Sequence, residues 1–183
     1  HRLVRITAPL NRITQYTYET ELQLFINSST NALSQVDRKT WNSLCAQTAV
    51  ATGVNGETLT FTYDVFCRPT LKTFAPGGHY ERSIYAVGTA TVRQNTRIET
   101  PSADGAGVQW TESYFDGAGR VFETRTKGVA PIVQSKTFDA LGRVATESLP
   151  YFLGQTAYNT SYKYDALGRR TETAFASGDK VAV

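Results

Sequence analysis

The chain has 183 residues, enough for one domain, of which 40% are hydrophobic and 19% charged. Its 19 basic and 16 acidic residues give a net charge of +3 and form no block of either sign, which argues against a nucleic-acid interface. No apolar run approaches the roughly 18 residues of a membrane-spanning helix.

The first third of the chain predicts two hairpins from spacing and one aromatic each. Tyr18-Glu19 and Trp41-Asn42 both place an aromatic before a polar residue, at an interval close to that of later motifs. We place strands of the second hairpin at 33–40 and 44–51. Thr52-Gly53-Val54-Asn55-Gly56 is predicted to be a turn, because Asn-Gly is a favoured hairpin dipeptide.

The next stretch contains a complete motif, Tyr63-Asp64-Val65-Phe66-Cys67-Arg68. Leu59, Phe61 and Tyr63 alternate with threonines before it, as in a strand with two different faces. Asp favours the first position of a type I turn, since its carboxylate accepts hydrogen bonds from N–H groups just ahead. The motif is therefore predicted to close an antiparallel hairpin.

The same pattern of aromatic, Asp, two free residues, Gly and Arg recurs three more times, in Phe115–Arg120, Phe138–Arg143 and Tyr164–Arg169. Gly at the fifth position tolerates the positive φ that a G1 bulge requires. Thr-rich, β-branched stretches follow the turns and favour strands. Tyr85-Ala86-Val87-Gly88 falls at the expected interval and is interpreted as a degenerate copy.

We therefore predict an all-β chain of tandem antiparallel hairpins over residues 1–183. The units with the full motif lie around 56–74, 108–126, 132–148 and 160–175, and the degenerate units around 12–26, 33–50 and 80–98. The repeated residues are Tyr63, Asp64, Arg68, Phe115, Asp116, Gly119, Arg120, Phe138, Asp139, Gly142, Arg143, Tyr164, Asp165, Gly168 and Arg169. Their role is predicted to be structural, with each arginine stacking on the aromatic of its own or the adjacent unit or pairing with an Asp.

The sequence favours no reaction chemistry. The only histidines are His1 and His79, and His79 follows a Pro-Gly-Gly turn. Cys45 and Cys67 have no metal-ligand spacing, and they form a disulfide only if the fold brings them together. We expect no catalytic residue, metal or cofactor, because no nucleophile–base or metal-ligating constellation is present.

At these motifs the chain resembles the YD-repeat, or RHS-repeat, family. The stretches Thr30–Gln35, Gly53–Gly56, Phe74–Gly78 and Leu149–Phe152 are similar to connectors in insecticidal Tc toxin B-type components and SpvB-like virulence proteins. The resemblance implies one spiralling β-sheet that forms part of a hollow shell around a cytotoxic segment. The family's closing segment with aspartyl self-cleavage activity has no counterpart here, and the four turn aspartates do not match it.

The resulting hypothesis is a structural shell segment of a secreted or cell-surface bacterial toxin or virulence protein. The chain neither begins with Met nor contains one, so we expect it to be a piece of something longer. Its expected partners are the remainder of a larger RHS-repeat polypeptide, an enclosed toxin segment and other toxin-complex subunits, with no nucleic acid. The alternative is an adhesive or carbohydrate-binding extracellular β-repeat, teneurin-like or wall-associated.

Overall fold

The computed structural model describes residues 2–182, so that His1 and Val183 lie outside the described residues. Seventeen strands make up the fold of these described residues. Within residues 2–182 the only helical element is a single 3-10 turn, η1 (Pro9–Asn11). All ladders between these strands are antiparallel. The prediction of an all-β chain of antiparallel hairpins is confirmed.

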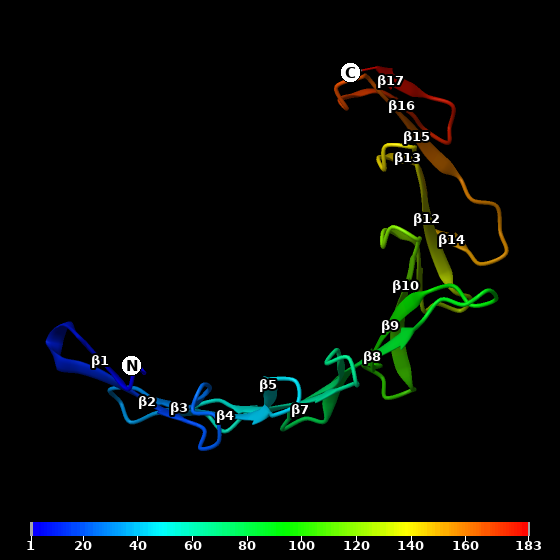
Figure 1. The fold of residues 1–183 in the computed structure, drawn as a ribbon. Coiled ribbons are helices and arrows are strands. Elements are labelled where there is room, and N and C mark those ends of the chain that lie inside the picture. The colour runs from blue at the N-terminus through cyan, green and yellow to red at the C-terminus, as the bar shows by residue number, and fades with distance from the viewer. Residues whose placement is uncertain (1, 183) are drawn as a thin grey trace. The chain divides into compact units, whose positions relative to one another are not determined.

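The chain divides into two compact units, His1–Ser83 and Ile84–Val183, and each is described by itself. In the first unit, ladders join every strand to the next one in the sequence, as Figure 1 shows. The strands are β1 (Arg5–Ala8), β2 (Arg12–Tyr18), β3 (Ile26–Thr30), β4 (Val36–Asn42), β5 (Gln47–Thr52), β6 (Thr58–Tyr63), β7 (Pro69–Ala75) and β8 (His79–Ala86), the last of which ends beyond Ser83.

The second unit has the same meander with one insertion. Its strands are β9 (Asn95–Pro101), β10 (Val108–Phe115), β11 (Val121–Thr126), β12 (Ile132–Phe138), β13 (Val144–Ser148), β14 (Tyr151–Phe152), β15 (Asn159–Tyr164), β16 (Arg170–Ala174) and β17 (Lys180–Ala182). Consecutive strands pair from β9 to β13. The short β14 pairs with the first half of β12, so that β13 continues directly to β15 and the ladder then runs to β17.

Hydroxyl pairs explain why threonine-rich segments form these strands. Thr62 on β6 contacts Thr70, the bulge residue of β7, with their hydroxyl oxygens 2.8 Å apart. Thr137 and Thr146 repeat the contact across β12 and β13 at 2.7 Å. Such cross-strand pairs stabilise a sheet locally and need no second layer above it.

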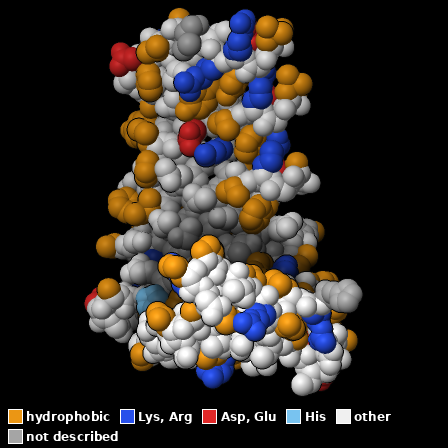
Figure 2. Space-filling view, turned by 90° about the vertical axis from the view of Figure 1, so that its left-hand side faces the viewer, with side chains coloured by type: hydrophobic (Ala, Val, Ile, Leu, Met, Phe, Trp, Pro, Cys, Tyr) orange, Lys and Arg blue, Asp and Glu red, His pale blue; other side chains and the backbone are white. Residues whose placement is uncertain are grey.

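Each unit is one layer thick and has little hydrophobic core (Figure 1). Among residues 2–182 the buried apolar side chains are Tyr114, which is 8% exposed, and Val133, which is 1% exposed. Figure 2 shows hydrophobic, basic and acidic side chains intermixed on the face that it presents. Contacts between neighbouring strands and turns therefore carry most of the stabilisation that a core supplies in a globular domain.

Two predicted strands begin too early. The strands expected at 33–40 and 44–51 are β4, which begins at Val36, and β5, which begins at Gln47. The Asn31 side chain accepts hydrogen bonds from the N–H groups of Leu33 and Gln35, which holds residues 31–35 in a turn. The Asn42 side chain accepts from the N–H of Cys45 and does the same for the next turn. The degenerate unit predicted around 80–98 covers β8 and the start of β9 and stays a prediction.

Candidate functional site

The turn between β12 and β13 represents all four full motifs. The Asp139 N–H donates to the Arg143 carbonyl at 2.9 Å, and the Gly142 N–H donates to the Asp139 carbonyl at 2.9 Å. Gly142 has φ +82°, and the ladder register shifts at Phe138, as expected for a turn that ends in a bulge. The same backbone bonds close residues 64–68, 116–120 and 165–169. The prediction that Gly119, Gly142 and Gly168 have positive φ is confirmed, and Cys67 adopts the same conformation at φ +59°.

The aspartate and arginine side chains hold this turn together from outside the backbone. Asp139 Oδ1 accepts hydrogen bonds from the N–H groups of Leu141 and Arg143, both at 2.9 Å. Its other oxygen, Oδ2, accepts from Arg143 Nε at 2.7 Å. Equivalent contacts join Asp64 to Arg68, Asp116 to Arg120 and Asp165 to Arg169. The repeated carboxylates thus serve the turns that they close.

All four turn carboxyls have a pKa below the usual aspartate range. At Asp64 and Asp139 loss of solvation is the largest influence and raises the pKa, but hydrogen bonds from the turn arginine and from backbone N–H groups together outweigh it. At Asp116 the backbone N–H of the turn arginine lowers the pKa most, and at Asp165 its guanidinium does. The motif therefore favours the charged carboxylate.

The same arginines also reach the next turn. The Arg120 guanidinium carbon lies 4.2 Å from the centre of the Phe138 ring, and that of Arg143 lies 4.5 Å from the centre of the Tyr164 ring. Arg143 Nη1 also donates to the Asp165 carbonyl at 3.3 Å. Both predicted roles of the arginines are therefore met together, because each of these two side chains pairs with its own Asp and stacks on the adjacent aromatic.

The first and last full motifs differ from this pattern. The Arg68 guanidinium carbon lies 5.2 Å from the ring centre of Phe66, within its own turn. Arg169 contacts no ring among residues 2–182, and its side chain is 75% exposed, against 28% for Arg143. Arg143 and Arg169 thus form a natural pair for comparison, since both close a turn and only Arg143 clamps a following one.

Where a repeat opens with Tyr or Trp, that side chain donates a hydrogen bond back to the preceding hairpin. Tyr164 donates from its hydroxyl to the Val144 carbonyl at 2.8 Å, and Tyr63 donates to the Thr48 carbonyl at 2.6 Å. Equivalent bonds run from Tyr18 to Leu3 at 2.8 Å and from the indole of Trp41 to Ile26 at 3.2 Å. The aromatics that marked the two degenerate units at the start of the chain therefore make the same backward bond as Tyr63 and Tyr164, whereas Phe115 and Phe138 have no donor for it.

Sequence reasoning missed two further copies of the backbone turn, at residues 31–35 and 175–179. In the second, the Phe175 N–H donates to the Asp179 carbonyl at 2.8 Å and the Gly178 N–H to the Phe175 carbonyl at 2.9 Å. The Asn31 N–H donates to the Gln35 carbonyl and the Ser34 N–H to the Asn31 carbonyl, both at 3.0 Å. Asn31 Nδ2 donates to Gln35 Oε1 at 2.8 Å, and Ser34 has φ +60°. Asn-Ala-Leu-Ser-Gln at 31–35 corresponds position by position to Asp-Ala-Leu-Gly-Arg at 139–143. The signal in the sequence was this shared order of residues, with neutral amides in place of the charged Asp and Arg.

A disulfide joins Cys45 to Cys67, which settles the pairing that the sequence left open. The bond connects the turn between β4 and β5 to the turn between β6 and β7, with a Cα–Cα distance of 5.3 Å. The Gln47 amide also donates to the Cys67 carbonyl at 3.0 Å. In the first unit this covalent bond connects two successive motif turns, as the side chains of Arg120 and Arg143 do in the second unit.

A charged cluster around Tyr114 was not visible in the sequence, because its members come from three separate segments. The guanidinium carbons of Arg93 and Arg125 lie 4.4 and 4.8 Å from the centre of the Tyr114 ring. Glu123 bridges the two arginines at 2.9 and 2.6 Å, and the tyrosine hydroxyl donates to Glu112 at 2.7 Å. Burial and then the bond to Glu112 raise the pKa of Tyr114. Burial also acts to raise the pKa of Glu123, but the two arginines lower it overall. The cluster acts as a polar core for the second unit.

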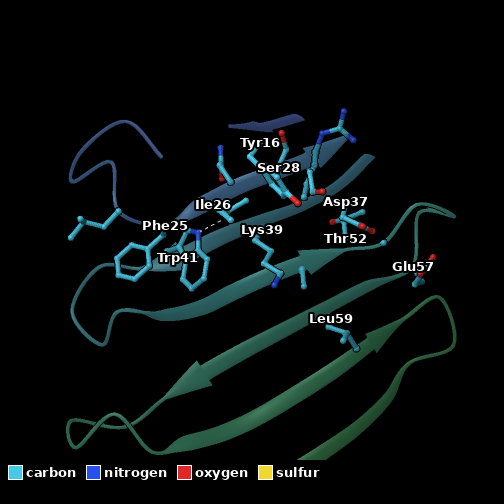
Figure 3. A pocket seen from close by; sticks show the side chains of 16 residues that line it. Tyr16, Phe25, Ile26, Ser28, Asp37, Lys39, Trp41, Thr52, Glu57 and Leu59 are labelled. Atoms are coloured by element: carbon cyan, nitrogen blue, oxygen red, sulfur yellow. Dashed lines mark hydrogen bonds between the residues drawn. The ribbon is translucent and has the colours of Figure 1, made fainter. Parts of the chain in front are cut away.

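A groove opens on one face of the first unit (Figure 3). It has a volume of about 630 Å³ and is lined from β2 to β6. At one end Phe25 and Trp41 stack with ring centres 4.6 Å apart, and toward the other end lie Asp37 and Glu57. Lys39 lies between them.

His79 is the candidate histidine that lies within the described residues. His79 begins β8 and its ring meets Phe74 edge-on, with centres 5.9 Å apart. Residues 2–182 contain no group of three or more His, Cys, Asp or Glu side chains placed to share a metal ion. In that same part of the chain no helix has the length and apolarity needed to span a membrane.

A family model described as "Domain of unknown function (DUF6443)" matches residues 88–180, which are 93 of the 183 residues. The chain belongs to the DUF6443 family. The matched stretch of this DUF6443 protein contains three of the four full motifs and the Tyr114 cluster. No curated protein sequence matches the chain.

Solved structures of similar fold come from Tc toxins. The crystal structure of TcdB2-TccC3 aligns with a TM-score of 0.77 at 13% identity, over 93% of this chain and 12% of the other. The same complex without its hypervariable C-terminal region aligns with a TM-score of 0.46 at 13% identity, over 97% and 12% of the two chains. The Photorhabdus luminescens Tc holotoxin pore aligns at 0.40 and 14%, over 94% and 12%. The fold assignment rests on the first alone, and this DUF6443 chain spans 12% of that relative's length.

Proposed function

We propose that this chain is a wall segment of a YD/RHS-repeat shell in a secreted bacterial toxin or virulence protein. In this proposal the segment contributes hairpins to a hollow sheet that encloses a toxic polypeptide until delivery. Its partners are the remainder of the larger polypeptide, the enclosed segment and other subunits of the toxin complex. The segment has no reaction of its own, since its repeated carboxylates are held by the turns that they close.

The observation that carries the proposal is that each unit is a one-layer sheet whose turns are linked to one another. Arg120 and Arg143 each clamp the following turn, and the cystine joins two equivalent turns in the first unit. A wall must resist bending and separation without a packed core. Links between successive hairpins provide that resistance. The similarity in fold to TcdB2-TccC3 supports the same conclusion.

Limited proteolysis of the longest natural polypeptide that contains this chain tests the proposal. We expect the enclosed segment to resist a broad-specificity protease in the wild type. Asp139→Ala, which removes the acceptor at the centre of one turn, should open the wall and expose that segment. Asp37→Ala is the matched control, because Asp37 is an exposed carboxylate that closes no turn. If the protease digests the enclosed segment as fast in the wild type as in Asp139→Ala, the proposal is contradicted.

A further inference from the structure

The turns of the full motifs carry apolar side chains at their tips. The second residue after the turn aspartate is Phe66, Leu141 or Leu167 in three of the four motifs, and these residues are 73, 76 and 78% exposed. Each donates its backbone N–H to the aspartate, a bond that needs nothing from the side chain. Gly, Asn, Asp and Ser are the usual residues of such turns. A repeated apolar side chain that its own turn does not require indicates a surface that another segment covers.

These tips form a row along one rim of each unit. In the first unit Leu44, which is 93% exposed, lies two residues after Asn42, and the disulfide joins its turn to the turn of Phe66. In the second unit Arg143 reaches the next motif turn, which places Leu141 and Leu167 on one rim. We call Leu44 and Phe66 the tip ridge of the first unit, and Leu141 and Leu167 the tip ridge of the second.

Strand spacing sets the period of a tip ridge. The turn between β4 and β5 and the turn between β6 and β7 are two strands apart, because consecutive strands pair from β4 to β7. The turn between β12 and β13 and the turn between β15 and β16 are also two strands apart, because β13 pairs directly with β15. Neighbouring strands lie about 4.8 Å apart, so that successive tips recur at about 10 Å.

The charges beside the tips are neutralised within each turn. Asp139 pairs with Arg143 and Asp165 with Arg169, with nitrogen–oxygen distances of 2.7 Å in both turns. The turn of Phe66 holds the same kind of pair. Residues 42–46, which carry Leu44, contain no charged side chain. A rim of this kind can face another rim of the same kind without repulsion between like charges.

We infer that each tip ridge packs against a second row of the same hairpin tips, supplied by another stretch of the longer polypeptide. A row of tips built on the same strand spacing matches the ridge over successive turns, and apolar tips that meet bury the leucine side chains from water. The chain spans 12% of the length of TcdB2-TccC3, and a polypeptide of that size has room for further rows of hairpins. This inference rests on the proposed shell function and names the residues that close the seam between two rows.

An α-helix is the other element whose period fits, since residues seven apart in a helix lie about 10.5 Å apart along its axis. A helix packs with its ridge of side chains between two rows of its partner. Each tip ridge is a single row that projects from turns, and it therefore favours a second set of projecting tips.

Photo-cross-linking of the longest natural polypeptide that contains this chain can test the inference. Free cysteines in flanking segments are replaced, and Leu141→Cys is labelled with a benzophenone maleimide, which then reacts with whatever lies against the tip. We expect the cross-linked peptide to be the turn of a hairpin that is distant in sequence and belongs to the same molecule. Gln134→Cys is the matched control, because Gln134 is exposed on β12 of the same hairpin but lies away from the tip. It should form no cross-link to a turn.

Hydrogen exchange of residues 139–143 in the same polypeptide gives a second measurement. Leu141→Ser should raise the exchange rate by about tenfold, equivalent to about 1.4 kcal/mol, because it removes the apolar side chain that the seam buries. Ala140→Ser, which introduces the same hydroxyl into the same turn, should stay within about twofold of wild type.

Three cross-linking results with Leu141→Cys would overturn the inference: a link to a helix or to a segment outside the repeats, a link to a second molecule, or no link to any peptide. Equal exchange rates in Leu141→Ser and Ala140→Ser would overturn it as well. If the enclosed segment still resists the protease in any of these cases, the shell function stands and only the seam is wrong, so that the two failures are distinguishable.

Discussion

The link between Cys45 and Cys67 allows a sharp prediction because it joins two turns that other contacts also align. Cys67 occupies the motif position that glycine has in the other three copies, and it has φ +59°. The Gln47 amide bond to the Cys67 carbonyl, at 3.0 Å, does not depend on the sulfurs. The folded arrangement should therefore survive removal of the disulfide, and the main effect should fall on the unfolded chain.

The magnitudes can be worked from the spacing and the backbone. The two cysteines are 22 positions apart, and closing a loop of that length in the unfolded chain corresponds to about 3 kcal/mol. A residue other than glycine in the left-handed region costs about 1 kcal/mol. We expect Cys45→Ser with Cys67→Ser to lose about 3 kcal/mol, and Cys45→Ser with Cys67→Gly to lose about 2 kcal/mol because glycine relieves the backbone.

Urea unfolding of the oxidised wild type and the two double variants measures these differences, and the wild type with a reductant is the internal control. The reduced wild type should match the Ser/Ser variant. If the reductant leaves the unfolding midpoint of the wild type unchanged, the disulfide does not stabilise the protein. If the Gly variant is no more stable than the Ser variant, the argument from the left-handed backbone is wrong.

Three further predictions concern the turns of the second unit and can be measured by hydrogen exchange of peptides that cover each turn. Gly142→Ala should destabilise its turn by about 1 kcal/mol or more. The loss should exceed that of Gly168→Ala, because an added Cβ would lie 2.9 Å from Arg120 Nη1 at position 142 and would meet no atom within 4 Å at position 168. Equal losses would show that the contact with Arg120 has no effect. Arg143→Ala should destabilise its turn by about 0.5–1 kcal/mol more than Arg169→Ala destabilises its own, since of these two arginines only Arg143 stacks on a following aromatic. The reverse order would refute the link between turns. The turn aspartates of the second unit, Asp116, Asp139 and Asp165, have lowered pKa values in the folded state. Their contribution to stability is therefore present above the unfolded pKa of about 4 and is lost as pH falls through the lower folded values. Protection of these turns that rises below pH 4 would contradict this sign.

The turns were predictable because their signal is local. Asp139, Gly142 and Arg143 act within five residues, and the backbone that they require follows from their own chemistry. The strands beside them follow from alternation and β-branched content. The same logic failed at residues 31–35, because Asn31 and Ser34 form the turn without the charge or the glycine by which the motif was identified.

Contacts between successive hairpins were not predictable in detail, because they depend on the register between strands and not on a local sequence pattern. The arginine could have stacked within its own unit or on the next, and only the sheet decides this. The groove depends on Ser29, Ala51 and Gly53 falling beside one another, which no local pattern marks. Small residues at matched positions of successive strands are the signal that a search for such hollows requires.

A structure of the longest natural polypeptide that contains this chain, determined by cryo-electron microscopy, tests the central claim most directly. The account predicts these hairpins as part of a one-layer wall, with further hairpins paired to an outer strand and with enclosed polypeptide against one face. It also predicts that Arg143 lies on the ring of Tyr164 in the assembled wall. A second sheet or a layer of helices packed over both faces, with no enclosed chain, would contradict the account.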